Sequence, residues 1–246
     1  MSTVRIGAVQ APEFHDDLPG SLQFLDEMSG RAKQRNVELL AFPEGFVQGY
    51  IVEEDAARRI AIDLGSRQFD VLLEKCPKSG PMLVFGMIES LEGRLFNTAV
   101  VIQNQTLVGK YRKTHLLPRE AAFSSGRDVP VFDVQGLRFC INICYDTNFP
   151  DLAECAVRHG ARLVVCCANN MLRRQTAEKY TPVHNAVRGQ RCRETRMWLM
   201  SSDVTGDRAG HLALGPTAVL NPKGEVVLQL PLGEVGMLVF DLPNAR

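Results

Sequence analysis

Short apolar segments rich in β-branched residues recur along the whole chain and predict many strands. We expect these strands at residues 4–10, 37–42, 82–88, 98–103, 107–111, 137–143, 163–167, 197–201, 217–220, 226–230 and 237–242. Amphipathic stretches predict helices between several of them, at residues 18–35, 53–75, 149–159 and 178–194. Short turns favour hairpins at Glu92-Gly93, Asn104-Gln105 and Lys223-Gly224. The pattern therefore predicts an α/β fold with mixed strand directions and more than one packed layer.

Composition and charge narrow the class of protein further. The 246 residues are 45% hydrophobic and 23% charged, and 28 basic residues balance 28 acidic ones. A chain without net charge has no field that attracts nucleic acid or an anionic membrane surface. Its apolar runs are far shorter than the roughly 20 residues that a bilayer span needs. With no linker, repeat or secretory signal readable, we expect a single cytoplasmic domain over residues 1–246 that binds neither nucleic acid nor membrane.

Seven cysteines stand at positions 76, 140, 144, 155, 166, 167 and 192, and none of them form a Cys-x-x-Cys pair. A disulfide framework or a structural zinc site needs paired spacings. We therefore expect most of these cysteines to be small buried hydrophobes in a reducing compartment.

Reactive side chains follow three of the predicted strands, where active sites of α/β proteins gather. Glu44 comes directly after an apolar strand that Pro43 stops. Lys113 ends a basic segment in which alternation places it on the same face as Tyr111, opposite Lys110 and Arg112. Taken alone, the glutamate is also typical of a solvated loop, and the lysine of a solvated sheet edge.

The third strand, at residues 137–143, runs into Cys144, and Pro150 and Asp151 open a helix shortly afterwards. A thiol at such a tight turn is expected near the positive end of a helix dipole, which stabilises the thiolate. Backbone N–H groups at the turn are placed to bind an oxyanion. A buried structural cysteine is the alternative interpretation.

Together, these three segments resemble the nitrilase, or carbon-nitrogen hydrolase, superfamily. The motifs that carry the resemblance are Phe42-Pro43-Glu44, Tyr111-Arg112-Lys113-Thr114-His115-Leu116 and Ile143-Cys144-Tyr145-Asp146 with Phe149-Pro150. The likeness covers nearly the whole chain and includes Gly7-Ala8-Val9-Gln10, Phe96-Asn97-Thr98-Ala99 and Gly224-Glu225. It implies a four-layer α-β-β-α sandwich and a Glu-Lys-Cys triad made of Glu44, Lys113 and Cys144.

The resemblance also implies a mechanism for cleaving an amide without metal or cofactor. Cys144 attacks the carbonyl carbon, and Glu44 accepts the thiol proton and delivers it to the leaving nitrogen. Lys113 and the backbone N–H of Tyr145 hold the oxyanion, and Glu120 orients the lysine. His115 suggests a papain-like partner for Cys144, but its place inside the lysine motif favours a structural role.

Departures from the family pattern bear on the substrate. Asn148 stands where many members carry an arginine, Asp203 where an asparagine is common, and Thr217 where a serine is usual. Members that act on nitriles tend to carry Cys-Trp-Glu, whereas this chain reads Cys144-Tyr145-Asp146. We therefore expect hydrolysis of a small, neutral amide, with release of ammonia or an amine.

Three residues are predicted to bind the substrate: Asn148, Asn169 and Asn170. Whether His184, Arg173, Arg174 or Arg188 reach the pocket stays open at this point. So do three other functions: an N-carbamoyl amine or amino-acid hydrolase, a catalytically silent binding member of the fold, and a thiol-redox protein that uses Cys144.

Relatives of this kind commonly pair through the helices that follow the Glu and Cys strands. The stretch at residues 149–159 is amphipathic, and the chain ends directly after its last predicted strand. We therefore expect a homodimer or a higher homo-oligomer such as a tetramer, rather than a filament.

Overall fold

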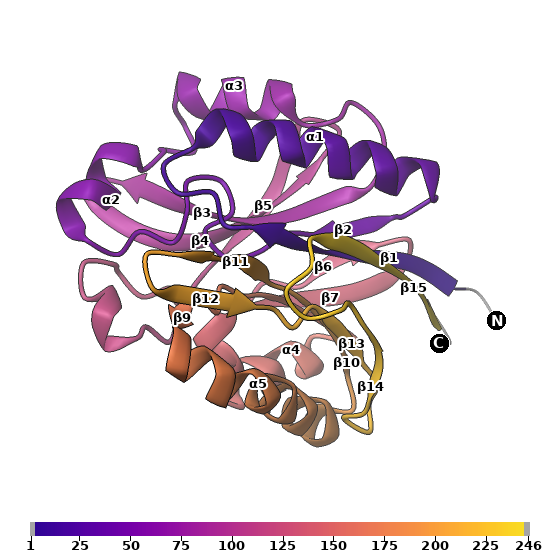
Figure 1. Cartoon of the computed structure of the whole chain (residues 1–246). Coiled ribbons are helices and arrows are strands. Elements are labelled where there is room, and N and C mark those ends of the chain that lie inside the picture. The colour runs from indigo at the N-terminus through magenta and orange to yellow at the C-terminus, as the bar shows by residue number, and fades with distance from the viewer. Residues whose placement is uncertain (1–2, 244–246) are drawn as a thin grey trace.

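Two β-sheets lie face to face, and helices cover the outer face of each sheet (Figure 1). The computed structural model describes residues 3–243. The order of layers is α-β-β-α, which confirms the predicted sandwich. Within the described residues, no helix is both long and apolar enough to cross a bilayer.

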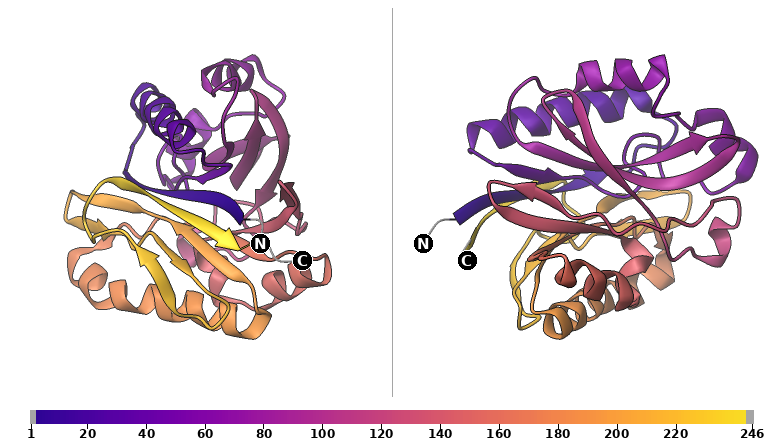
Figure 2. Two further views of the ribbon diagram at one scale, coloured as in Figure 1. Left: turned by 90° about the vertical axis from the view of Figure 1, so that its right-hand side faces the viewer. Right: turned by 180° about the vertical axis from the view of Figure 1, so that it is seen from behind.

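The first sheet has the strand order β5-β4-β3-β2-β1-β11-β12-β9 within residues 3–243, and β15 also pairs with β1. Its central strands β1, β2 and β3 are parallel, whereas β3, β4 and β5 are joined as antiparallel hairpins. Strands β1 and β15 run side by side (Figure 2). The bounds are β1 (Thr3–Pro12), β2 (Leu39–Ala41), β3 (Met82–Leu91), β4 (Arg94–Gln103), β5 (Thr106–Arg112), β9 (Leu172–Arg173), β11 (Val204–Arg208), β12 (His211–Leu214) and β15 (Gly236–Pro243).

The second sheet has the order β14-β13-β10-β8-β7-β6. Strands β7, β8 and β10 are parallel, and antiparallel strands flank them on both sides. The bounds are β6 (Phe132–Val134), β7 (Leu137–Ile143), β8 (Leu163–Cys167), β10 (Trp198–Ser202), β13 (Ala218–Leu220) and β14 (Val226–Gln229). The carboxyl ends of β7 and β8 therefore point in the same direction.

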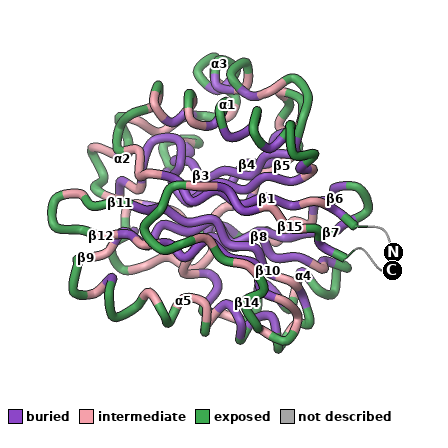
Figure 3. The backbone as a smooth tube through the Cα atoms, turned by 45° about the vertical axis from the view of Figure 1, so that its right-hand side comes forward, coloured by how far each residue is buried: buried purple, intermediate pink, exposed green. Residues whose placement is uncertain are grey.

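Apolar side chains fill the spaces between the layers, so the central strands are buried, whereas the helices and the edge strands β5 and β14 are partly exposed (Figure 3). One cluster lies between the sheets, where Ile6 and Val84 pack with Ile141. Helices α1 and α3 cover the first sheet, and α4 and α5 cover the second (Figure 1). The helix bounds are α1 (Leu18–Gln34), α2 (Glu54–Ile60), α3 (Arg67–Lys75), α4 (Asp151–Arg158) and α5 (Arg174–Thr195), with 3-10 helices η1 (Pro118–Glu120) and η2 (Cys144–Asn148).

The helix predicted over residues 53–75 is wrong as one element, because it divides into α2 and α3. Between them, buried Ile62 forms a bridge to Glu89 of β3, which draws the backbone into an extended form. Ser66 then begins α3 by accepting a hydrogen bond from the backbone N–H of Phe69. Four short strands, β6, β9, β11 and β12, are also absent from the sequence prediction.

Candidate active site

The ends of strands from both sheets meet at one place, and this brings the predicted residues together. Glu44 follows β2, and its backbone N–H donates to the carbonyl of Ala168 at the end of β8, over 3.2 Å. Gly86 of β3 makes the close approach possible, since a Cβ there would lie 2.7 Å from the Cα of Glu44. The turn that contains Glu44 can therefore pack closely between the two sheets.

Lys113 bridges two buried carboxylates. Its Nζ lies 2.8 Å from Glu44 Oε1 and 2.7 Å from Glu120 Oε1, and all three side chains are at most 1% exposed. The side-chain amide of Asn97 donates to the same two oxygens, over 2.8 and 3.2 Å. Two carboxylates can share this small space because the ammonium and the amide both donate to them.

Glu120 is fixed from two further directions. Its Oε2 accepts a hydrogen bond from the backbone N–H of Leu117 at 2.6 Å, and its Oε1 accepts one from the hydroxyl of Tyr50 at 2.9 Å. A carboxylate held by this many donors has little freedom to rotate. Glu120 therefore sets the position of the Lys113 ammonium.

Cys144 lies at the sharp turn where β7 passes into η2. Its backbone has a φ of 46°, in the left-handed region that residues other than glycine seldom adopt. The buried carboxylate of Asp146 holds this turn, because it accepts hydrogen bonds from Ile143 N (3.0 Å), His115 N (2.8 Å) and the hydroxyl of Tyr111 (2.7 Å). One side chain thus joins the cysteine turn to the lysine segment.

The Cys144 thiol is protonated in this environment. Burial raises its pKa well above the ordinary value and the charge of Glu44 raises it further, while Lys113 opposes both effects. The sequence-based expectation of a helix-stabilised thiolate is therefore wrong. The physical reason is that the cost of burying a thiolate, together with the negative charge of Glu44, outweighs the attraction of Lys113.

The carboxyl of Glu44 is suited to accept a proton. Burial raises its pKa above the usual value, Lys113 lowers it and Glu120 raises it. Burial also disfavours the ammonium of Lys113, yet the negative charges around it raise the pKa of this lysine well above its ordinary value. The lysine therefore stays charged while the glutamate can change its protonation state.

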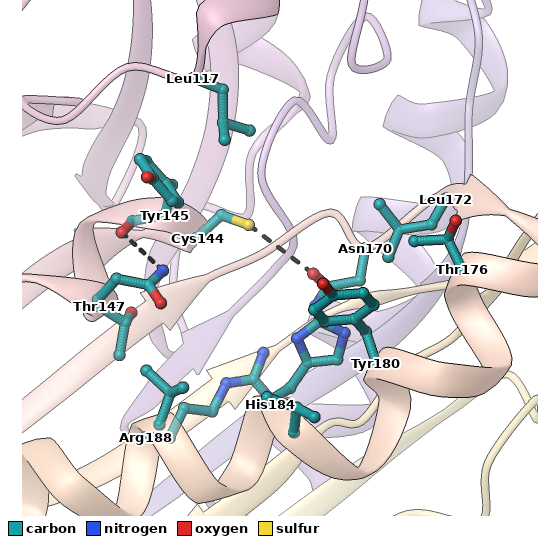
Figure 4. A pocket seen from close by; sticks show the side chains of 13 residues that line it. Leu117, Cys144, Tyr145, Thr147, Asn170, Leu172, Thr176, Tyr180, His184 and Arg188 are labelled. Carbon is teal, nitrogen blue, oxygen red and sulfur yellow. Dashed lines mark hydrogen bonds between the residues drawn. The ribbon is translucent and has the colours of Figure 1, made fainter.

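A cavity of about 360 Å³ opens beside Cys144 (Figure 4). Apolar and aromatic side chains form most of its wall, and they are Leu117, Tyr145, Leu172, Tyr180, Val183 and Val187. Its polar lining consists of Thr147, Asn148, Asn170, Thr176, His184 and Arg188. The Glu44, Lys113 and Glu120 cluster lies buried outside this lining, so Cys144 forms the boundary between the cavity and the charged groups.

The three asparagines predicted to bind substrate occupy different places. Asn148 lines the cavity, and its Nδ2 donates to the carbonyl of Tyr145 over 3.1 Å. Asn170 also lines it, with Oδ1 3.9 Å from Cys144 Sγ. Asn169 is not among the lining residues, since its Oδ1 accepts from Met171 N and its own N–H donates to Glu44 Oε2 at 3.1 Å. Its contact with the site is therefore made through the backbone.

The cavity presents little net charge at neutral pH. Arg188 reaches the wall, but its guanidinium pairs with buried Asp203 at 3.1 Å. Burial and the nearby Arg188 lower the pKa of His184 to about 4, so its imidazole is neutral. Arg173 and Arg174 are exposed and are not among the lining residues.

His115 has partners other than the thiol. Its Nε2 lies 3.0 Å from Asp151 Oδ1, and its ring stacks on Phe149 with centroids 3.9 Å apart. These contacts fasten the lysine segment to the start of α4. Among residues 3–243, no group of three or more His, Cys, Asp or Glu side chains is arranged to hold a metal ion.

Four residues that contact the site are missing from the sequence prediction: Tyr50, Asn97, Asp146 as a support, and Asp203 in contact with Asn170. Asn97 and Asp146 lie inside the motifs that resemble the family, and Asp203 stands where an asparagine is common. The sequence therefore contained a feature by which each of these three residues could have been found. No such feature marked Tyr50, because it contacts Glu120 across 70 positions of sequence.

Comparison with known proteins finds a matching family model and similar enzymes. The family model described as carbon-nitrogen hydrolase matches residues 5–246. An (R)-stereoselective amidase from Pseudomonas sp. is 28% identical over 214 residues, which are 86% of this chain and 76% of the relative. The omega-amidase NIT2-B from Xenopus laevis is 27% identical over 247 residues, which cover 92% of this chain and 84% of the relative.

Solved amidase structures share the fold of this chain. An amidase from Nesterenkonia sp. has a TM-score of 0.84 and 25% identity, with 99% of this chain and 91% of that chain covered. A mutant of the amidase from Nesterenkonia sp. AN1, with a TM-score of 0.84, 25% identity and coverage of 99% and 92%, shows the acetamide moiety of fluoroacetamide covalently added at the active site cysteine.

Proposed function

This chain belongs to the carbon-nitrogen hydrolase family, and we propose that it cleaves the C–N bond of a small neutral amide through an acyl thioester on Cys144. One arrangement carries the proposal: Lys113 bridges Glu44 and Glu120 at 2.8 and 2.7 Å. The segment at residues 169–170 joins this cluster to the thiol, because Asn169 N–H donates to Glu44 Oε2 and Asn170 Oδ1 lies 3.9 Å from Cys144 Sγ. This arrangement supplies a base and a cation in a buried cluster and a nucleophile at the edge of the cavity.

In the proposed acylation step, Cys144 Sγ forms a bond to the carbonyl carbon and its proton passes to Glu44. The carbonyl oxygen becomes an oxyanion, which the Lys113 ammonium and the backbone N–H of Tyr145 stabilise. Collapse of the tetrahedral intermediate breaks the C–N bond, and Glu44 returns the proton to the nitrogen. Ammonia, or an amine from a substituted amide, leaves, and an acyl thioester remains on Cys144.

Water completes the reaction. Glu44 accepts a proton from a water molecule as its oxygen attacks the thioester carbonyl, and the C–S bond then breaks. The proton returns to the sulfur, and a carboxylic acid leaves. Glu44 thus acts as base and acid in turn, and a pKa raised above that of an ordinary glutamate suits both roles.

The pH profile follows from these protonation states. The free enzyme needs ionised Glu44, so kcat/KM for a neutral amide is expected to be full above the raised pKa of Glu44 and to fall as the pH drops through it. It stays level into the alkaline range, because Cys144 and Lys113 both have pKa values raised well above ordinary. Initial rates across the pH range check this. Activity that instead rises with thiolate formation would contradict the role of Glu44.

The cavity wall favours a neutral substrate with an apolar acyl group. A volume of about 360 Å³ exceeds what the shortest amides fill, and its cation, Arg188, is already paired with Asp203. We expect kcat/KM for a neutral aliphatic amide to be at least about tenfold higher than for a carboxylate-bearing amide of the same length, since an unpaired charge is costly to bury.

An ammonia-release panel tests the substrate and the function together. It compares the neutral amide, the carboxylate-bearing amide, an N-carbamoyl amine and the matching nitrile. Preference for the N-carbamoyl amine would identify the alternative hydrolase, and preference for the nitrile would show that the reaction class is wrong. Release from none of them would favour a silent binding member, which the complete set of Glu44, Lys113, Glu120 and Cys144 argues against.

We also propose a cytoplasmic homodimer that forms through α4. This helix carries Val157, which is 39% exposed, next to the segment that positions Cys144. Light scattering at micromolar concentration is expected to give twice the chain mass of 27.3 kDa. Val157→Lys is expected to shift the protein toward the monomer, because a charge on this face resists burial. A strictly monomeric parent protein would contradict the proposal.

A further inference from the structure

Asp203 and Arg188 form a buried ion pair directly behind Asn170. Arg188 Nη2 lies 3.1 Å from Asp203 Oδ2, and the two side chains are 4% and 0% exposed. Arg188 Nη1 also donates to the carbonyl of Pro216 at 2.7 Å. Asp203 comes directly after β10 and Arg188 lies in α5, so the pair fastens the helix to the sheet beside the cavity.

Asp203 fixes the side chain of Asn170 at two points. Its Oδ1 accepts the backbone N–H of Asn170 at 3.0 Å, and its Oδ2 accepts the side-chain Nδ2 at 2.5 Å. An ionised carboxylate can only accept hydrogen bonds, so the amide nitrogen of Asn170 must face it. Arg188 Nη2 donates to the same Oδ2, so this oxygen accepts from two donors and offers none in return.

The opposite end of the Asn170 amide therefore faces the nucleophile. Its Oδ1 lies 3.9 Å from Cys144 Sγ and accepts a hydrogen bond from the thiol (Figure 4). If the amide turned over, Nδ2 would face the thiol, and two donors would meet there. The ion pair thus determines that an acceptor, rather than a donor, lies beside the reacting sulfur.

We propose that Asp203 and Arg188 are positioning residues which hold Asn170 Oδ1 to accept an N–H of the substrate carboxamide, and that this contact selects amides over esters of the same acyl group. The inference rests on the proposed amide hydrolysis. A carboxamide NH₂ donates to Oδ1, whereas an ester oxygen has only lone pairs and is repelled by it. Discrimination by a buried polar group of this kind is strong, because the wrong substrate leaves it unpaired.

The test compares kcat/KM for a neutral amide and for the methyl ester of the same acid. In Asn170→Ala and in Asp203→Asn, we expect the amide-to-ester ratio to fall at least about tenfold, which corresponds to about 1.4 kcal/mol. The variant that combines Asn170→Ala with Asp203→Asn is expected to have the same amide-to-ester ratio as Asn170→Ala alone, because Asp203 acts through Asn170. Equal losses for amide and ester, or additive losses in the double variant, would overturn the proposal.

Two further variants separate positioning from general damage. Glu89→Gln removes another buried ion-pair partner, that of Arg112, and is expected to leave the amide-to-ester ratio unchanged. If Asp203→Asn fails to fold because Arg188 is left unpaired, Asp203→Asn combined with Arg188→Met removes both charges and is expected to show the same lower ratio. A parental ratio in that folded double variant would overturn the proposal.

Alkylation of Cys144 provides a readout without turnover. The thiol displaces chloride from 2-chloroacetamide or from methyl chloroacetate: a C–S bond forms as the C–Cl bond breaks, chloride leaves, and the thiol proton passes to Glu44. The parent protein is expected to prefer the amide reagent, and Asp203→Asn is expected to lose this preference. Loss of the preference in a protein that hydrolyses no amide would contradict the proposed function alone, whereas an unchanged preference would overturn the positioning role alone.

Discussion

Replacing Cys144 by alanine is expected to reduce kcat for amide hydrolysis by at least about four orders of magnitude, because the nucleophile of a catalytic unit cannot be replaced by its neighbours. The fold should persist, since the side chain is half-buried at the cavity and Cβ remains. Ammonia release measures the loss, and thermal unfolding measures the stability.

Two other cysteines provide matched controls. Cys140 and Cys167 are at most 1% exposed and lie in the neighbouring strands β7 and β8. Alanine at either position removes a thiol of the same kind from the same sheet, so the activity should stay close to that of the parent. A Cys144→Ala protein with more than about one hundredth of the parent's kcat would contradict the thioester mechanism.

Replacing Lys113 by methionine is expected to lower both activity and stability. Loss of an oxyanion donor is expected to reduce kcat by about a thousandfold. The carboxylates of Glu44 and Glu120 would then face each other without the ammonium that lies 2.8 and 2.7 Å from them. Breaking a buried charge network on one side typically costs about 3–5 kcal/mol in the free energy of unfolding.

Lys110→Met is the control for this variant. Lys110 lies in β5, which ends at Arg112 directly before Lys113, and its side chain is half-buried, whereas Lys113 is fully buried. Replacement of Lys110 should leave the ammonia-release rate and the urea unfolding midpoint near those of the parent. A Lys113→Met protein with parental kcat would show that the ammonium does not act on the oxyanion.

The sequence predicts the strands that carry the site accurately. The apolar runs at residues 137–143 and 163–167 have the bounds of β7 and β8, because strands buried on both faces form continuous apolar segments. Strands β11 and β12 contain Gly206, Asp207 and His211 and lack such a run. β11 pairs with β1, and β12 pairs with β11, which holds both strands in the sheet. The local sequence pattern does not predict this pairing.

The sequence predicts the site residues that lie in the motifs, but it misses several residues that hold them in place. Glu44, Lys113 and Glu120 meet as the motifs suggested, because each follows a strand end or a short turn that the sequence marks. The orientation of Asn170 depends on Asp203, which lies 33 positions away. A contact between separate elements is set by packing, so sequence reasoning leaves it undetermined.

The most direct test of the proposed chemistry is rapid acid quenching during turnover of a neutral amide, followed by mass spectrometry of the intact chain and its peptides. We expect part of the chain to gain the acyl group in place of one hydrogen, on the peptide that contains Cys144 and at no other cysteine. Cys144→Ala should show no gain. Sustained ammonia release with an adduct on another residue, or with Cys144 unmodified throughout, would contradict the thioester mechanism.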